Sequence, residues 1–238
     1  MQKQATIVAA VVLGALGASA AHAGILIDSF NTDQTLQIDP GGVNPSSMMN
    51  GVATGAESIG GARAAMLMRT DGLQLLSTRV NITKGLLEFG AEPGVGGSVT
   101  VWYDGDSDTD LNPSGLGGAD LTDGGIDDAL SIAFRYDLAI DMTVRVYSGE
   151  GAVSELTFSF AGPAGFVGPF NTAILPYAAF VPVVGAGADF TNVGAISFFA
   201  STGEQFGADF QLDDIKTVPS PGAALALLAL TGLKRRRR

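Results

Sequence analysis

Hydrophobic and polar residues alternate with a period of two along much of the chain between residues 24 and 217. In residues 141–147, for example, Met142, Val144 and Val146 occupy every second position. Successive side chains of a strand point to opposite faces of its sheet, so this segment is predicted to bury these three and to turn Thr143, Arg145 and Tyr147 outward. No long stretch of this region repeats with the period of about 3.6 residues that is typical of a helix.

About ten segments with this pattern are separated by turns rich in Gly, Asp, Asn and Pro. They are residues 25–30, 62–69, 74–80, 98–103, 128–136, 141–147, 154–160, 179–184, 193–200 and 208–217. Thr70, Asp71 and Gly72, between the second and the third, predict a tight hairpin. Many short strands predict an all-β fold, a β-sandwich or jelly roll, with a helical turn or two in the connections. No linker divides residues 24–217, which are therefore predicted to form one domain.

Both ends of the chain have the features of export segments. Residues 1–23 begin with a positive charge, continue with an apolar run and end in an A-x-A pattern at Ala23, which predicts a signal peptide cut there by signal peptidase. Residues 218–238 combine a proline-containing spacer, a short apolar stretch expected to be helical, and a basic end that should stay cytoplasmic. The alternatives are an uncleaved N-terminal anchor helix and an unprocessed C-terminal anchor.

The C-terminal segment resembles the PEP-CTERM sorting signal of Gram-negative bacteria, in its V-P-x-P-G variant. The residues that carry the resemblance are Val218, Pro219, Ser220, Pro221 and Gly222, and then Arg235, Arg236, Arg237 and Arg238. Ser220 stands where the family usually has Glu, and the apolar stretch, residues 222–233, is shorter than the roughly 20 residues of a membrane span. The resemblance implies an exosortase-type membrane protease as a partner, in bacteria that make exopolysaccharide, with transient membrane anchoring before release or transfer to the cell surface.

The middle of the chain resembles a galactose-binding-like jelly roll, as found in many carbohydrate-binding modules. The resemblance rests on IDSF at residues 27–30, DFTNVGAI at 189–196 and DFQLDDI at 209–215. It implies a fold more than a function. In such modules acidic residues near the termini often hold a structural calcium ion, and the matching positions are Asp28, Asp213 and Asp214. The alternative is that these carboxylates cap strand ends or face solvent.

The charge balance changes once the predicted export segments are set aside. The whole sequence has a formal net charge of -11. Residues 24–217 keep seven of the 13 Lys and Arg and all 24 Asp and Glu, which gives -17. His22 is the only histidine and there is no cysteine, so this domain has no Ser-His-Asp triad, no cysteine nucleophile and no histidine- or thiolate-bound metal. The acidity also argues against nucleic acid as a partner.

The densest acidic segment suggests another calcium site, because alternate carboxylates in a curved loop can converge on one hard cation. The candidate ligands are Asp104, Asp106, Asp108 and Asp110. The Gly and the closing Glu that an EF-hand requires are missing in both possible registers. The alternative is a solvated acidic loop that raises solubility.

Aromatic residues out of phase with the predicted core would form a carbohydrate-binding face, since aromatic rings offer apolar surfaces to sugar rings. Trp102, Tyr147 and Phe199 meet this condition. Exposure of Trp102 and Tyr147 on one shared face would favour sugar binding, and their burial would favour a structural role.

Glycoside hydrolysis needs two carboxylates on either side of the scissile bond. Glu88, Glu150, Glu155 and Glu204 are available, and their spacing selects no pair. We therefore predict an exported, non-catalytic β-sandwich protein of the cell surface or extracellular matrix. The alternative is a carbohydrate-binding module for extracellular exopolysaccharide, and a carboxylate-based hydrolase comes third.

Overall fold

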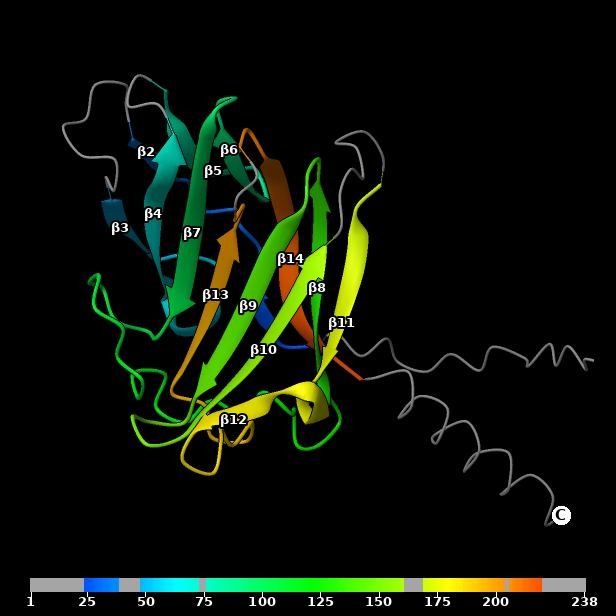
Figure 1. The fold of residues 1–238 in the computed structure, drawn as a ribbon. Helices are drawn as coiled ribbons and strands as arrows, with labels where there is room; N and C mark the ends of the chain where they lie inside the picture. Colours follow the sequence, from blue (N-terminus) through cyan, green and yellow to red (C-terminus); the bar gives the residue numbers. More distant parts are fainter. Residues whose placement is uncertain (1–23, 39–47, 73–75, 161–168, 204–205, 220–238) are drawn as a thin grey trace, which may run out of the picture.

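The computed structural model describes residues 24–38, 48–72, 76–160, 169–203 and 206–219. Within these residues, fourteen strands form two seven-stranded sheets that pack face to face (Figure 1). Two short 3-10 turns, η1 (Ile59–Gly61) and η2 (Tyr177–Ala179), lie in the connections. The predicted all-β sandwich is confirmed.

The first sheet contains both ends of the domain, β1 and β14. Its strands are, in spatial order, β11 (Asn171–Pro176), β8 (Ala129–Tyr136), β14 (Asp209–Val218), β6 (Leu86–Ala91), β5 (Thr78–Thr83) and β2 (Gln34–Ile38), with β1 (Leu26–Asp28) also paired to β14. The second sheet contains β12 (Val181–Val184), β10 (Val153–Phe160), β9 (Ile140–Tyr147), β13 (Ala195–Ser201), β7 (Val95–Tyr103), β4 (Ala62–Gly72) and β3 (Met48–Thr54). Neighbouring strands of the second sheet run antiparallel.

The core between the sheets is built by the alternation seen in the sequence. In β9, Met142, Val144 and Val146 are at most 1% exposed, and the residues between them face the other way. Aromatic contacts add to this core, as where Phe89 of β6 stacks on Phe210 of β14 with ring centroids 4.9 Å apart. Such pairs contribute about 1 kcal/mol beyond the area they bury. The predicted inner and outer faces of β9 are therefore confirmed.

A buried ion pair connects the first strand to the second sheet. Asp28 in β1 accepts hydrogen bonds from Arg63 Nη1 of β4, at 2.9 and 3.2 Å, and from Tyr103 Oη of β7, at 2.8 Å. The side chains of Asp28 and Arg63 are both 0% exposed. Burial, and next the charge of Asp28, raise the pKa of Tyr103, so its hydroxyl remains a donor. The cost of burying two charges is offset because each one is hydrogen-bonded on several sides.

The hairpin predicted at Thr70, Asp71 and Gly72 is wrong. The backbone of β4 continues through these residues and pairs with β7 as far as Val95, with a bulge between Arg69 and Asp71. The next strand, β5, lies in the other sheet, between β2 and β6. Thr70, Asp71 and Gly72 instead end β4, before the chain crosses to the other sheet. The backbone pairing of β4 with β7 outweighs their local preference for a turn.

Four strands were not predicted: β2, β3, β6 and β11. Three of them, β2, β3 and β11, are edge strands, which bury fewer side chains and so carry a weaker pattern. The fourth, β6, alternates clearly but follows β5 after a tight turn. In that turn Lys84 and Gly85 both have positive φ, of 53° and 83°. Positive φ at both central residues is the geometry of a two-residue hairpin turn.

The two ends of the domain lie side by side. The Ile25 amide donates to Thr217 Oγ1 at 2.7 Å, and the Thr217 amide donates to the Ile25 carbonyl at 2.9 Å. Val218 ends β14 and Pro219 follows it. The predicted signal peptide and the rest of the predicted sorting signal lie outside the described residues, and both stay predictions. In the described part of the chain, no helix is long and apolar enough to cross a membrane.

Candidate functional site

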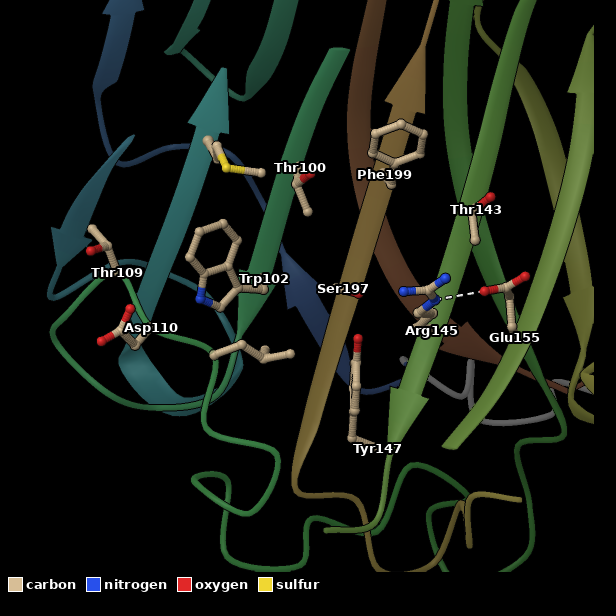
Figure 2. Close-up of a pocket in the computed structure, with 12 residues that line it drawn as sticks. Thr100, Trp102, Thr109, Asp110, Thr143, Arg145, Tyr147, Glu155, Ser197 and Phe199 are labelled. Atoms are coloured by element: carbon tan, nitrogen blue, oxygen red, sulfur yellow. Dashed lines mark hydrogen bonds and ion pairs between the residues drawn. The ribbon is translucent and has the colours of Figure 1, made fainter. Parts of the chain in front are cut away.

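The outer side of the second sheet carries a pocket of about 550 Å³, called the outer pocket below. Side chains that point away from the core on β7, β13, β9 and β10 form its floor, and the loop that follows β7 forms one wall (Figure 2). The residues on which its chemistry depends are Trp102, Asp110, Arg145, Tyr147, Glu155 and Phe199. Strand alternation places them together, since each lies out of phase with the buried residues of its own strand or belongs to the loop.

Aromatic side chains from three strands line the outer pocket. Phe199 of β13 is 38% exposed and Tyr147 of β9 is half-buried. Trp102 of β7 shares this face but is only 6% exposed, and its Nε1 is buried without a hydrogen-bond partner. The structure thus brings Trp102 and Tyr147 into one pocket, where Tyr147 and Phe199 present the accessible rings. The burial of Trp102 favours a structural role for it in the pocket floor.

Polar cross-strand pairs lie beside the aromatic rings. Arg145 of β9 and Glu155 of β10 are directly opposite in register, and Arg145 Nε donates to Glu155 Oε2 at 2.6 Å. The hydrogen bond to Glu155 is the main cause of a raised pKa for Arg145, and Tyr147 adds to it. One step along, the hydroxyls of Thr143 and Thr157 are 2.9 Å apart. This face therefore has an aromatic half and a hydrogen-bonding half.

The acidic loop after β7 is held together by its own carboxylates. Asp104, only 2% exposed, accepts hydrogen bonds from the backbone amides of Asp106, at 3.1 Å, and Asn112, at 2.8 Å. Asp106 accepts from the Asn112 side chain at 2.7 Å, and Asp108 from the Asp110 amide at 3.0 Å. These are the local contacts by which Asp shapes turns. Asp110 of this loop lines the outer pocket. In the described residues, no group of three or more acidic side chains that could hold a metal ion is found.

The predicted calcium site between the first and last strands is not supported. Asp28 accepts hydrogen bonds from Arg63 and Tyr103, so a guanidinium takes the place that a metal ion would need. Asp214 pairs with Lys216. Burial, and next the charge of Asp214, raise the pKa of Asp213. Asp28 is thus a core residue, and the buried Arg63 together with the Tyr103 hydroxyl offsets the burial of its charge.

Two carboxylates border the outer pocket, Asp110 on the loop side and Glu155 on β10 (Figure 2). A hydrolase needs one of its two carboxyl groups protonated as a general acid. Glu155 is instead the acceptor in an ion pair with an arginine. Glu88 lies in the first sheet and Glu150 is exposed in the turn after β9, and neither lines the pocket. Glu204 lies outside the described residues.

The sequence predicted that Arg145 faces outward, but it did not predict its pairing with Glu155. In the sequence, Glu155 is only one of four glutamates available as a catalytic acid. The signal that could have found the pair is the short connection at residues 148–152, with Gly149 and Gly151, which sets the register of β9 against β10. The wall formed by Asp110 had no such signal, since a loop folds back onto a sheet only through tertiary contacts.

No protein-family model matches the chain, and no curated protein matches it significantly. Among solved structures, it is similar to the family 11 carbohydrate-binding module of cellulosomal cellulase Lic26A-Cel5E of Clostridium thermocellum. The TM-score is 0.38 and the identity 10%, over 83% of this chain and 95% of that chain. It is similar to TmCBM61, solved in complex with β-1,4-galactotriose, with a TM-score of 0.33 and 8% identity over 81% and 91%.

The agarase AgWH50C also matches in part. Its TM-score is 0.38 and its identity 10%, over 64% of this chain and 22% of that chain. At such low TM-scores and identities these similarities assign no function.

Proposed function

We propose that this protein is a non-catalytic carbohydrate-binding protein that acts outside the cell, and that the outer pocket holds a stretch of polysaccharide. The observation that supports this is the meeting, in one pocket, of the rings of Phe199 and Tyr147 with the hydrogen-bonded pair Arg145 and Glu155. Its volume of about 550 Å³ is within the range typical of small-molecule sites.

A sugar ring has two kinds of surface, and the outer pocket has a counterpart for each. The apolar C–H face of a pyranose stacks on aromatic rings such as Phe199 and Tyr147. Its hydroxyls both donate and accept, and here Arg145 supplies donors next to the acceptor oxygens of Glu155. Hydrogen bonds to charged groups are stronger than those between neutral groups. Because these side chains stand on strands, little backbone freedom is lost when a sugar binds.

Export would bring this pocket to its ligand. The sequence of residues 1–23 supports secretion, and that of residues 218–238 supports recognition by an exosortase-type protease and transient anchoring at the cell envelope. Ile25 and Thr217 meet in the first sheet, whereas the outer pocket lies on the far side of the second. A domain tethered after Val218 would therefore keep the outer pocket free. Mass spectrometry of the exported protein should find Gly24 as its first residue.

The binding proposal is tested with full-length protein, purified in a detergent that contains no sugar, against a panel of polysaccharides. Phe199→Ala and Tyr147→Ala should each weaken binding up to about tenfold, because each removes a stacking ring. Phe206→Ala is the matched control, since Phe206 is 44% exposed and does not line the outer pocket. Binding to no polysaccharide, or equal losses in Phe199→Ala and Phe206→Ala, would overturn the proposal.

The same material distinguishes binding from hydrolysis. A binding protein leaves the polysaccharide intact, so no new reducing ends should form during long incubation. Reducing ends that form with the wild type and disappear with Glu155→Gln would replace the proposal with a carboxylate-based hydrolase.

A further inference from the structure

The charges of the outer pocket bear on the class of sugar that it accepts. Of the described residues that line it, Arg145 is the cation, and Asp110 and Glu155 are the anions. The cation is already engaged, because its Nε donates to Glu155 at 2.6 Å. Beyond the pocket, residues 24–217 carry a formal charge of -17, and two of their seven basic residues, Arg63 and Arg69, are buried. The domain as a whole therefore presents a strongly negative surface.

We propose that Glu155 determines specificity, by making the outer pocket accept uncharged sugars and reject sugars that carry a carboxylate. This inference rests on the proposed carbohydrate binding. A guanidinium with no partner would hold the carboxylate of a uronic acid in a two-bond fork. With Glu155 in place, the positive charge of Arg145 already has a counter-charge, and an incoming carboxylate is repelled by both Glu155 and Asp110.

The geometry of the pair fits a selective role. Arg145 and Glu155 are direct cross-strand neighbours, so the backbone register keeps the carboxylate beside the guanidinium. The Glu155 side chain is 24% exposed and that of Arg145 is 52% exposed, so Glu155 is the more enclosed partner. The exposed part of Arg145 can still donate to a neutral hydroxyl, which displaces nothing. Because the pKa of Arg145 is raised, its guanidinium stays charged across the physiological pH range.

The test uses pairs of oligosaccharides that share a backbone and differ in the carboxylate, such as β-1,4-glucan with β-1,4-glucuronan and mannan with mannuronan. Wild-type full-length protein at low ionic strength should bind the neutral member about fivefold more tightly or better. Glu155→Gln should lose this preference or reverse it, since its amide leaves Arg145 free for the uronate. High salt should reduce the change, because exposed charges are screened.

The control variant is Asp141→Asn, which removes one negative charge from the same sheet face of β9. Asp141 is exposed and does not line the outer pocket, so its substitution should leave the preference unchanged. Glu155→Asp keeps the charge on a shorter side chain and should give an intermediate preference. It also serves as the second variant if Glu155→Gln does not fold, as judged by its thermal melt.

The outcomes separate the two proposals. If the wild type binds uronans as well as neutral glycans or better, the specificity inference is overturned and carbohydrate binding stands. An unchanged preference in Glu155→Gln, or the same change in Asp141→Asn, also overturns it, because net charge would then be the selector. If the wild type binds neither member on any backbone, the proposed function fails and this inference fails with it.

Discussion

Two arginine–carboxylate pairs in the described residues have the same chemistry and opposite surroundings. The pair of Asp28 and Arg63 is 0% exposed on both sides, with a closest contact of 2.9 Å. The pair of Arg145 and Glu155 is 52% and 24% exposed, with a contact of 2.6 Å. The shorter contact belongs to the exposed pair, so distance alone does not tell what a pair contributes. Burial decides how much a pair contributes to stability, because burial sets the cost of leaving either charge without its partner.

The inner pair is part of a closed network. Asp28 is also held by Tyr103, and Arg63 also donates to Gln34 Oε1 at 2.9 Å. Every bond in such a network depends on the others, since a buried group that loses its partner cannot find water instead. The outer pair has water on one side and can exchange it for the hydroxyls of a ligand. The first pair therefore stabilises the fold, and the second is available for recognition.

The largest expected effect comes from Asp28→Asn. This change leaves the buried Arg63 without a counter-charge and should lower the free energy of unfolding by about 3–5 kcal/mol. Urea unfolding followed by circular dichroism measures it. The double variant Asp28→Leu with Arg63→Met should recover much of the loss, because an apolar pair carries no charge to bury. A loss below about 1 kcal/mol in the single variant would mean that the inner pair contributes no more to stability than an exposed pair does, and would contradict the role given to burial.

The next effect is smaller, because Tyr103→Phe removes a single hydrogen bond to Asp28 and keeps the ring. We expect a loss of about 1–2 kcal/mol in unfolding free energy, since a buried charged acceptor loses one donor. Tyr147→Phe makes the same chemical change on the outer face, where water replaces the lost contact. Its cost should stay within about 0.5 kcal/mol. Equal losses in the two variants would show that burial does not separate the inner network from the outer pocket.

Glu155→Gln should cost less than about 1 kcal/mol of folding stability, as is usual for an exposed ion pair. The difference from the wild type should shrink as salt is added, because screening weakens exposed charges. Thermal melts at low and high salt measure both effects. A loss as large as that of Asp28→Asn would give the outer pair a structural role and remove the contrast between folding and recognition.

The smallest effect comes from a carboxylate of intermediate burial. Burial, and next the charge of Asp137, raise the pKa of Asp209. The folded state then binds this proton more tightly than the unfolded state. The contribution of Asp209 to stability is therefore unfavourable at neutral pH and improves as the pH falls through its raised pKa. Asp209→Asn should remove this dependence and stabilise the protein at neutral pH by about 0.5 kcal/mol or less, since solvent screens a half-exposed group.

The measurement is the stability difference between wild type and Asp209→Asn across the acidic range. The variant keeps an oxygen that can accept from the Ala91 amide, the bond that Asp209 Oδ1 accepts at 3.2 Å. A difference that stays constant with pH, or that grows as the pH falls, would contradict a raised pKa for Asp209.

The sequence predicted an element well where neighbouring strands and the core fix its pattern, and poorly where the element is a turn or a loop. The faces of β9 were predicted correctly because this central strand has a buried side that demands an apolar residue at every second position. The hairpin at Thr70 and Gly72 was predicted wrongly, because nothing local tells a turn from a strand end that crosses between sheets. Trp102 was placed on the outer side correctly, but the sequence did not decide between its exposure and its burial, and the structure shows it 6% exposed. The acidic loop that forms the neighbouring wall is separated from β13 and β9 by long stretches of chain.

By itself, the sequence determined the all-β class, the strong acidity, and the absence of histidine and cysteine chemistry from residues 24–217, because these follow from periodicity and composition. Only the tertiary structure decided what each acidic residue does. Asp28 became the partner of a buried arginine, Asp104 the organiser of a loop, and Glu155 the partner of an arginine in a pocket. The physical reason is that a carboxylate takes its role from the donors and the solvent around it, and long-range packing alone sets both.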